Sequence, residues 1–297
     1  MIQYRAFLTL QWVMERLPRG LAYALAIVVA RLAFVFARGA RSALADNLRA
    51  ARPEATAAEI RTLTYRNFRY HSKAYADLMR LPTASVEDLR PLMDTQGLEH
   101  LEAALARRRG VLVVSAHMGS WEVAAAIWSA TIAPVSLFAE VLEPKEMYAW
   151  YRQTRARLGI SVLPLNQAGL RQVLRALNNN EMVVTAVDRD FTGTGVETTM
   201  FGRPVRIPHG PAAIAVRRGT PLLPVCVLRQ PDDRYLAIGW PPIFAKDSGD
   251  AEADVRWVVE RLVAHLEEII RAHPEQWHMP HRLWPAQAQA RSGTLEL

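Results

Sequence analysis

Cysteine and lysine are scarce in this chain of 297 residues. The single cysteine, Cys226, excludes a disulfide framework within one chain, which is compatible with a reducing compartment. It lies in the apolar run 222–228, so we expect a buried strand residue rather than a nucleophile. Only three of the 36 basic residues are lysines, so arginine carries almost all of the net charge of +7. Arginine suits phosphate and carboxylate groups, and this balance favours contact with anionic surfaces.

Several well-known functional motifs are also missing. The chain has no Gly-x-Ser-x-Gly elbow and no lysine-containing phosphate loop. Gly193 and Gly195 match the first two positions of a dinucleotide fingerprint, but Thr198 occupies the third. The histidines and carboxylates lack recognised metal-ligand spacing, and no nucleic-acid recognition motif accompanies the basic charge. We therefore expect no metal, no nucleotide cofactor and no nucleic-acid partner.

A long, clean membrane span is absent from the most apolar part of the chain. Residues 21–37 are apolar except for Arg31, which places them at the lower limit for a transmembrane helix. Together with the apolar segment 6–14 they could instead form a hairpin in the membrane interface. We predict that residues 1–45 form an apolar, helical, membrane-associated segment and that residues 46–297 form one domain. The sequence leaves open whether the segment spans the membrane or lies on it.

Short apolar runs then alternate with helical patterns. Strands are expected at 111–114, 135–139, 160–163, 182–187, 222–228 and 235–239, and helices at 55–81, 98–109, 145–158, 170–177 and 253–272. Such alternation is typical of an α/β fold with a mainly parallel central sheet flanked by helices.

The most informative stretch is the end of the first of these apolar runs. His117 follows this run after Ser115 and Ala116, and Gly119 provides a turn toward a helix that carries Glu122. Ligand sites in open α/β sheets lie at the carboxyl ends of the strands, which is where a general base would stand. A second charged group, headed by Asp188, follows the run 182–187. Either Glu122 or Asp188 could orient the imidazole of His117, and the spacing alone does not decide between them.

These residues carry a resemblance. The segment His117-Met-Gly-Ser-Trp-Glu122 resembles the His-x4-acid motif of glycerolipid acyltransferases. The wider pattern is similar to the lipid A biosynthesis acyltransferase family, including its phosphatidylinositol mannoside acyltransferase branch. The matching segments cover most of the chain: Asp46–Leu48, Gly97–Glu122, Arg155–Gly159, Asp188–Asp190, Gly195–Val196, Phe201–Gly202, Gly210–Ala212 and Pro274–Trp277.

The resemblance implies a glycerolipid acyltransferase-like fold and an O-acyltransferase reaction. His117 would be the general base, with Glu122 and Asp188 as the other catalytic candidates. Backbone N–H groups near Gly119 would stabilise the oxyanion. The remaining residues expected to bind substrate are Trp121, Arg155, Arg157, Arg189, Asp190, Arg206 and Gly210, among which Arg155 or Arg157 matches a functional arginine of the lipid A branch.

The implied partners are acyl-CoA or acyl carrier protein as acyl donor and a membrane glycolipid as acceptor. We expect the reaction at the cytoplasmic face of the inner membrane, with the donor as co-substrate and no cofactor. The acceptor, the acyl-chain length and the choice of donor are not determined by any motif. The alternative is a non-catalytic, basic, membrane-associated protein that binds anionic glycolipid.

Overall fold

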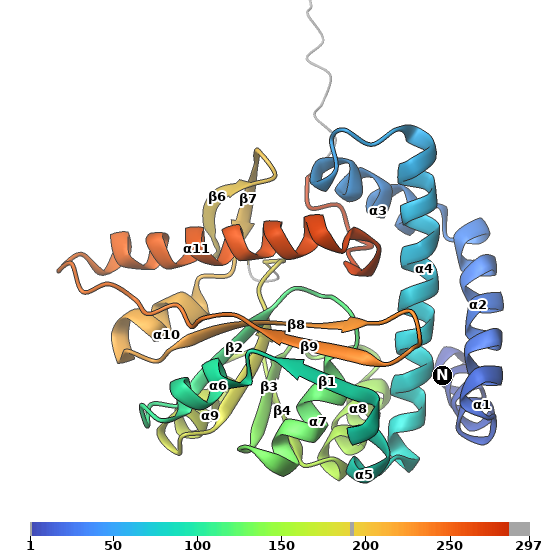
Figure 1. Cartoon of the computed structure of the whole chain (residues 1–297), viewed down its shortest axis with the longest axis horizontal. Helices are drawn as coiled ribbons and strands as arrows, with labels where there is room; N and C mark the ends of the chain where they lie inside the picture. Colours follow the sequence, from blue (N-terminus) through green and yellow to red (C-terminus); the bar gives the residue numbers. More distant parts are fainter. Residues whose placement is uncertain (1, 191–192, 285–297) are drawn as a thin grey trace, which may run out of the picture.

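The structure is a computed structural model that describes residues 2–190 and 193–284. A seven-stranded sheet lies at its centre, in the order β1-β9-β8-β2-β5-β3-β4 (Figure 1). The strands are β1 (Met93–Gln96), β2 (Val111–Ser115), β3 (Val135–Ala139), β4 (Ile160–Pro164), β5 (Met182–Ala186), β8 (Leu222–Arg229) and β9 (Tyr235–Gly239). All neighbours are parallel except β8 and β9. The predicted α/β class with a mainly parallel sheet is confirmed.

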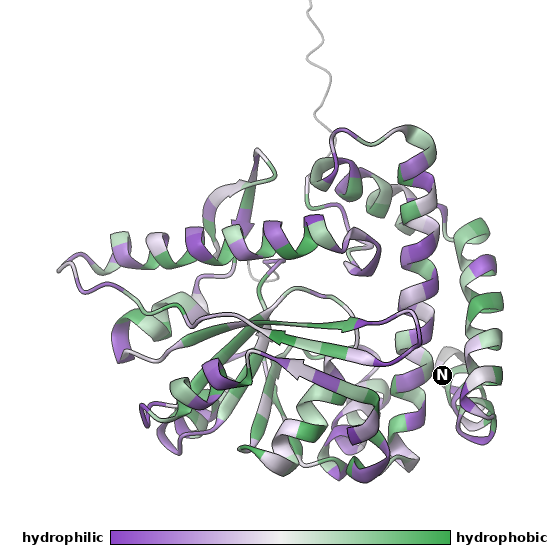
Figure 2. Ribbon diagram, viewed as in Figure 1, coloured by the Kyte–Doolittle hydropathy of each residue, from purple (hydrophilic) through white to green (hydrophobic). Residues whose placement is uncertain are grey.

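Both faces of the sheet are covered, which explains why its central strands are mostly apolar. Leu112 and Val114 of β2 belong to a core with α9 (Gln167–Asn178), α10 (Gly210–Arg218) and α11 (Ala251–Ala272). The alternate residues Val111 and Val113 belong to a second core with α6 (Leu98–Leu105), α7 (Trp121–Thr131) and α8 (Lys145–Arg157). Figure 2 shows the hydrophobic central strands between these helices. Strands buried on both faces are characteristic of parallel sheets.

The N-terminal third of the chain is helical: α1 (Ile2–Arg16), α2 (Arg19–Phe36), α3 (Arg38–Ala51) and α4 (Ala57–Arg80). A capping box starts α4, because the Thr56 side chain accepts from the Glu59 amide while the Glu59 carboxylate accepts from Thr56. The α2 helix lies alongside α4 (Figure 1) and buries the small residues Ala22, Ala26 and Ala30. Spaced four residues apart, these form one helix face.

Two features differ from the sequence-based expectations. The antiparallel hairpin of β6 (Val196–Met200) and β7 (Arg203–Ile207) and the edge strand β1 were not predicted. Both consist of short strands with polar residues, and they lack the continuous apolar run that marks the buried strands. The division of the chain at residue 45 stays a prediction.

Candidate functional site

Two neighbouring parallel strands bring His117 and Asp188 to the same edge of the sheet. The pairing of β2 with β5 sets Ser115 opposite Ala186, the last residue of each strand. His117 and Asp188 each follow two residues later. Their convergence therefore results from strand order and register, since 71 residues separate them in the chain.

The contacts between the two residues are close. The Nδ1 of His117 lies 2.6 Å from Oδ1 of Asp188, and the backbone N–H of His117 donates to Oδ2 at 2.9 Å. The indole N–H of Trp277 donates to the same Oδ2, also at 2.9 Å. An ionised carboxylate only accepts hydrogen bonds, so Nδ1 of His117 is the protonated nitrogen and Nε2 carries the lone pair. Asp188 thus fixes both the ring orientation and the tautomer.

Burial and charge act in opposite directions on this pair. The carboxylate of Asp188 raises the pKa of His117 above its ordinary value of about 6.5, although burial opposes this. Burial by itself would raise the pKa of Asp188. The positive charge of the imidazole and the hydrogen bonds from His117 and Trp277 outweigh burial and hold that pKa below its usual range. The fully buried Asp188 is therefore a carboxylate at neutral pH.

Glu122 has a different partner. Its carboxylate accepts from Arg155 at 3.1 Å, and both side chains are largely buried. The Arg155 guanidinium also lies 4.9 Å from the Trp121 ring and 4.8 Å from the Tyr151 ring. Of the two carboxylates that the sequence left open, Asp188 is thus the one that contacts His117. Glu122 instead holds Arg155 in place between two aromatic rings.

Gly119 makes the sharp turn between β2 and α7. Its φ of +60° lies in the left-handed region, and a Cβ there would stand 1.5 Å from the carbonyl oxygen of Val227. The N–H of Gly119 donates to the carbonyl of Gln276 at 3.4 Å, and that of Ser120 donates to the carbonyl of Val227 at 3.3 Å. The expected oxyanion donors at Gly119 are therefore occupied by protein carbonyls. The next amides along the chain are those of the first turn of α7.

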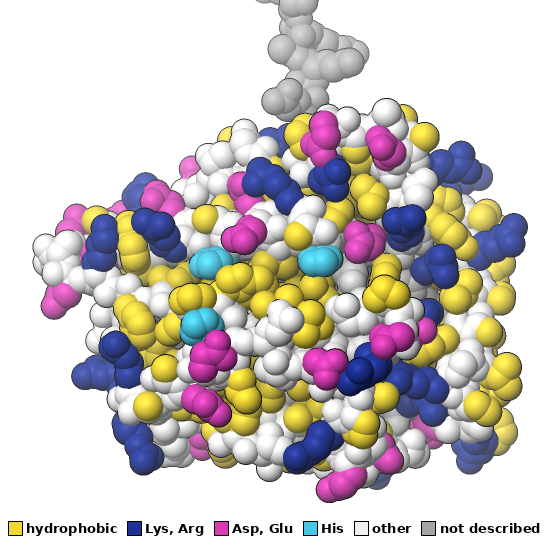
Figure 3. All heavy atoms as spheres, in the orientation of Figure 1, with side chains coloured by type: hydrophobic (Ala, Val, Ile, Leu, Met, Phe, Trp, Pro, Cys, Tyr) yellow, Lys and Arg dark blue, Asp and Glu magenta, His cyan; other side chains and the backbone are white. Residues whose placement is uncertain are grey.

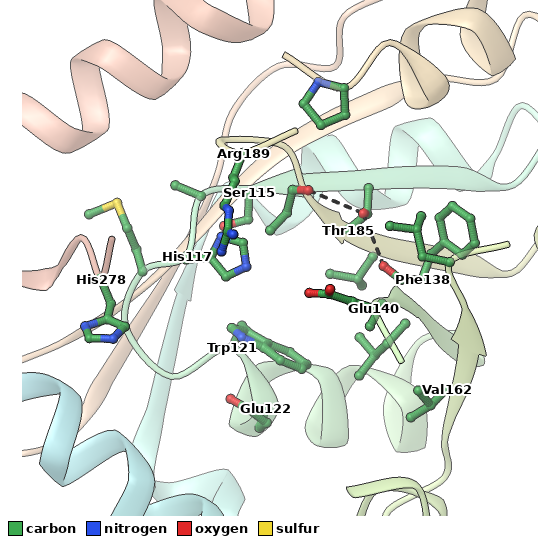
Figure 4. Close-up of a pocket in the computed structure, with 18 of the residues that line it drawn as sticks. Ser115, His117, Trp121, Glu122, Phe138, Glu140, Val162, Thr185, Arg189 and His278 are labelled. Carbon is green, nitrogen blue, oxygen red and sulfur yellow. Dashed lines mark hydrogen bonds between the residues drawn. The ribbon is translucent and has the colours of Figure 1, made fainter. Parts of the chain in front are cut away.

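A cavity of about 470 Å³ lies beside this edge of the sheet. His117, Trp121, Glu140 and Arg189 surround one part of it, while Phe138 and Val162 lie farther from His117 (Figure 4). Most of the lining is apolar or aromatic, from α4, β3, β4, β5, α8 and the segments that follow β3 and β4: Tyr75, Leu78, Leu137, Phe138, Leu142, Tyr148, Tyr151, Val162, Leu165 and Val184. The site therefore joins a histidine–carboxylate pair to a largely apolar cavity.

The predicted substrate-binding residues divide into two groups. Gly119, Trp121, Arg155, Arg189, Asp190 and Gly210 line the cavity. Asp190 also accepts from the amides of Gly193 and Gly195. Arg157 and Arg206 lie outside the lining: the first bonds the carbonyl of Pro82, and the second pairs with Glu197 at 2.6 Å.

Among the residues at the site that were not assigned to it from the sequence, four bear on its chemistry. Glu140 follows the end of β3, so the strand-end argument that identified His117 could have found it. Trp277 ends the matching segment Pro274–Trp277, and it is a fully buried donor to Asp188. His71 and His278 also line the cavity, with their rings stacked 3.1 Å apart. Nothing in the sequence pairs these two distant histidines.

Both stacked imidazoles are neutral. Burial, and then the charge of His117, lowers the pKa of His71 to about 3, and burial lowers that of His278 well below its ordinary value. Asn67 donates to the carbonyl of Trp277, so its side-chain oxygen is the group that accepts from Nδ1 of His278 at 3.2 Å. Within residues 2–190 and 193–284, no group of three or more His, Cys, Asp or Glu side chains is placed to hold a metal ion.

Comparison with known proteins gives the family. The family model described as bacterial lipid A biosynthesis acyltransferase matches residues 2–286. A phosphatidylinositol mannoside acyltransferase of Mycobacterium tuberculosis (strain CDC 1551 / Oshkosh) is 32% identical over 225 residues, which cover 73% of this chain and 68% of that protein. The lipid A biosynthesis lauroyltransferase of Escherichia coli K12 is 27% identical over 277 residues, or 91% of this chain and 87% of that protein. The chain therefore belongs to the bacterial lipid A biosynthesis acyltransferase family.

Proposed function

We propose that this chain transfers a long-chain fatty acyl group from a thioester donor, acyl-CoA or acyl carrier protein, to a hydroxyl of a membrane glycolipid. The observation that carries this proposal is the contact of His117 with the buried Asp188 beside a largely apolar cavity. Family membership supports acyl transfer, and the names of the relatives point to an acceptor of the phosphatidylinositol mannoside or lipid A type. The proposal includes the glycerolipid acyltransferase architecture for this α/β domain.

In the proposed reaction, Nε2 of His117 takes the proton of the acceptor hydroxyl as its oxygen attacks the thioester carbon. The tetrahedral intermediate then collapses, the carbon–sulfur bond breaks, and the imidazolium returns the proton to the leaving thiolate. Asp188 stabilises the imidazolium that forms between the two steps. General base catalysis of this kind contributes roughly 10²- to 10⁴-fold in rate. The donor is a co-substrate, and the reaction as proposed uses no cofactor.

The oxyanion of the intermediate requires hydrogen-bond donors near His117. The first four N–H groups of a helix have no partner within it, and the helix dipole favours negative charge at that end. We assign this role to the first-turn amides of α7, those of Trp121 and Glu122, in place of Gly119. Both residues line the cavity. The acyl chain itself would occupy the apolar part of the cavity between α4, α8 and strands β3 to β5.

The proposed position at the membrane rests on α2. It is the one helix among the described residues that is long and apolar enough to cross a membrane, with a mean hydropathy of 1.8 over 18 residues. One of its faces packs against α4, while Leu21 and Phe36 on the outside are 57% and 77% exposed. We propose that this outward face lies in the lipid interface at the cytoplasmic face of the inner membrane and that α2 does not cross the bilayer.

Product analysis with lipid extracts tests the proposed reaction. Purified protein is incubated with the extract and either palmitoyl-CoA or acylated carrier protein, and the lipids are followed by mass spectrometry. We expect a glycolipid to gain one acyl mass with the wild-type chain and not with His117→Ala, whose fold is checked by circular dichroism. If His117→Ala retained near wild-type turnover, the general-base assignment would be wrong. If neither donor gave a product in extracts that contain glycolipid, a non-catalytic glycolipid-binding protein would be the better description.

A further inference from the structure

A second cavity, of about 220 Å³, lies apart from the acyl-transfer site between α4 and the turn that joins β8 to β9. It is lined by Arg66, Arg69, Tyr70, Lys73, Gln230, Pro231, Asp233 and Glu275, and is called here the α4 basic pocket. The three cationic residues are three and four positions apart on α4, a spacing that places them on one helix face. None of the eight lining residues belongs to the larger cavity.

The cationic side chains of this pocket outnumber its carboxylates. Lys73 binds both oxygens of Asp233 at 2.8 Å, and Arg229 lies 3.4 Å from the same carboxylate. Among the described residues, no carboxylate lies within ion-pair distance of Arg66 or Arg69, and both side chains are exposed. Glu275 is the remaining acid of the lining. Two guanidinium groups thus face solvent at the pocket with their charges unpaired.

The other groups of the pocket are hydrogen-bond donors or hold it in shape. Burial, and then the charge of Glu275, raises the pKa of Tyr70, so its phenol stays neutral and can donate. Arg19 donates to the backbone carbonyl of Asp233 at 2.6 Å, which ties the β8–β9 turn to the start of α2. That carbonyl is neutral, so Arg19 adds a further positive charge to this region.

The neighbourhood of the pocket indicates which anion it would meet. Arg19 is the first residue of α2, whose outward face exposes Leu21, Val28 and Leu32. Figure 3 shows hydrophobic side chains along the edge where α2 lies and Lys and Arg side chains beside them over α4. An apolar helix face flanked by arginines is the pattern of surfaces that sit in the interface of anionic membranes.

We propose that the α4 basic pocket binds the phosphate of an anionic membrane lipid headgroup. The guanidinium groups of Arg66 and Arg69 donate paired hydrogen bonds to the phosphate oxygens. Tyr70 and Lys73, which Asp233 holds in place, are further donors. This site goes beyond acyl transfer: it selects anionic membrane and holds the chain on it through lipid that is not consumed. It does not depend on the reaction proposed above.

The test compares two pairs of arginines by vesicle binding. In Arg66→Gln with Arg69→Gln the pocket loses both unpaired guanidinium groups. In the matched control, Arg171→Gln with Arg175→Gln, two exposed arginines of α9 are removed, and neither lines the pocket. Co-sedimentation is measured with vesicles of phosphatidylcholine alone and of phosphatidylcholine with phosphatidylinositol. Circular dichroism and thermal melting verify that both variants are folded, which is expected because all four side chains are exposed.

We expect the pocket variant to lose about 10- to 30-fold in affinity for the phosphatidylinositol vesicles, since each basic residue at an anionic surface is worth about 1 kcal/mol. Its affinity for neutral vesicles and the behaviour of the control should match wild type. An equal loss in the control would mean that net charge, and no specific site, governs binding. Unchanged vesicle binding with a raised dissociation constant for coenzyme A, measured by calorimetry, would assign the pocket to the donor instead. Either of these results overturns the proposal.

Discussion

At the scale of single residues, the most consequential contact is the one between His117 and Asp188. An asparagine at position 188 would keep the size of the side chain but would bring no negative charge to stabilise the imidazolium. It could also present its N–H₂ group to the ring, which would favour the wrong tautomer. For Asp188→Asn we therefore expect kcat to fall by about 10²- to 10⁴-fold, measured with saturating donor. Trp277→Phe removes only one hydrogen-bond donor to Asp188 and should lower kcat far less.

The pH dependence of the same rates follows from the raised pKa of His117. The base must be neutral to act, so the wild-type rate should rise with pH through an inflection above about 6.5. In Asp188→Asn the carboxylate that raises this pKa is gone, and the inflection should move to lower pH. An identical inflection in the two proteins would contradict the assignment. The free energy of unfolding should change with pH in the opposite direction to the rate. The stabilisation from protonated His117 is complete below about pH 6.5 and is lost as pH rises through the raised pKa.

At the scale of an element, the turn from β2 into α7 depends on a residue without a side chain. In Gly119→Ala the methyl group meets the Val227 carbonyl, and the residue must adopt a left-handed conformation. We expect a loss of at least about 3 kcal/mol in the free energy of unfolding, because β8 and the turn cannot both keep their positions. Gly210→Ala is the matched control, since nothing lies within 4 Å of its Cβ position at the start of α10. Urea denaturation of the two variants provides the comparison.

A second prediction at this scale concerns the outward face of α2. Val28→Glu with Leu32→Glu places two charges on the outward face and leaves the contacts with α4 intact. Membrane binding should fall by about 10²- to 10⁴-fold, since each buried aliphatic side chain contributes about 1.5–3 kcal/mol. Pelleting with vesicles measures this. Removal of residues 1–40 would test membrane binding less specifically, because it would also remove Tyr23 and its hydrogen bond to Asp77 at 2.6 Å. Unchanged pelleting would show that α2 does not hold the chain on the membrane.

At the scale of the whole molecule, a buried cluster ties the N-terminal helices to the sheet. Asp77 of α4 pairs with Arg229 of β8, and it accepts from Tyr23 of α2 and Tyr235 of β9. Asp77→Asn would leave the buried guanidinium without its main partner, at a cost of about 3 kcal/mol in the free energy of unfolding. Asp94→Asn breaks the exposed pair of Asp94 with Arg234 and should cost about 0–1 kcal/mol. Equal losses in a urea titration would contradict the structural role of this cluster.

Much of this architecture was accessible from the sequence because its signals are local. The bounds of β3 and β9 agree with the predicted runs, and those of β4, β5 and β8 differ by one residue. Buried parallel strands can be recognised by continuous apolar runs. Helices can be recognised by the helical spacing of their apolar residues and by their capping residues. His117 was identified because it stands shortly after the end of such a run. The β6–β7 hairpin escaped prediction because its alternating polar residues, such as Glu197 and Arg206, carry no comparable signal.

The sequence by itself therefore determined the fold class, the histidine at the strand end and the resemblance that the family match confirmed. Only the tertiary structure decided which carboxylate meets that histidine. Glu122 is five residues away and pairs with Arg155, whereas Asp188 is 71 residues away and lies 2.6 Å from the ring. The physical reason is that strand order and register are set by packing of the whole sheet. Residues at the ends of adjacent parallel strands meet regardless of their separation along the chain.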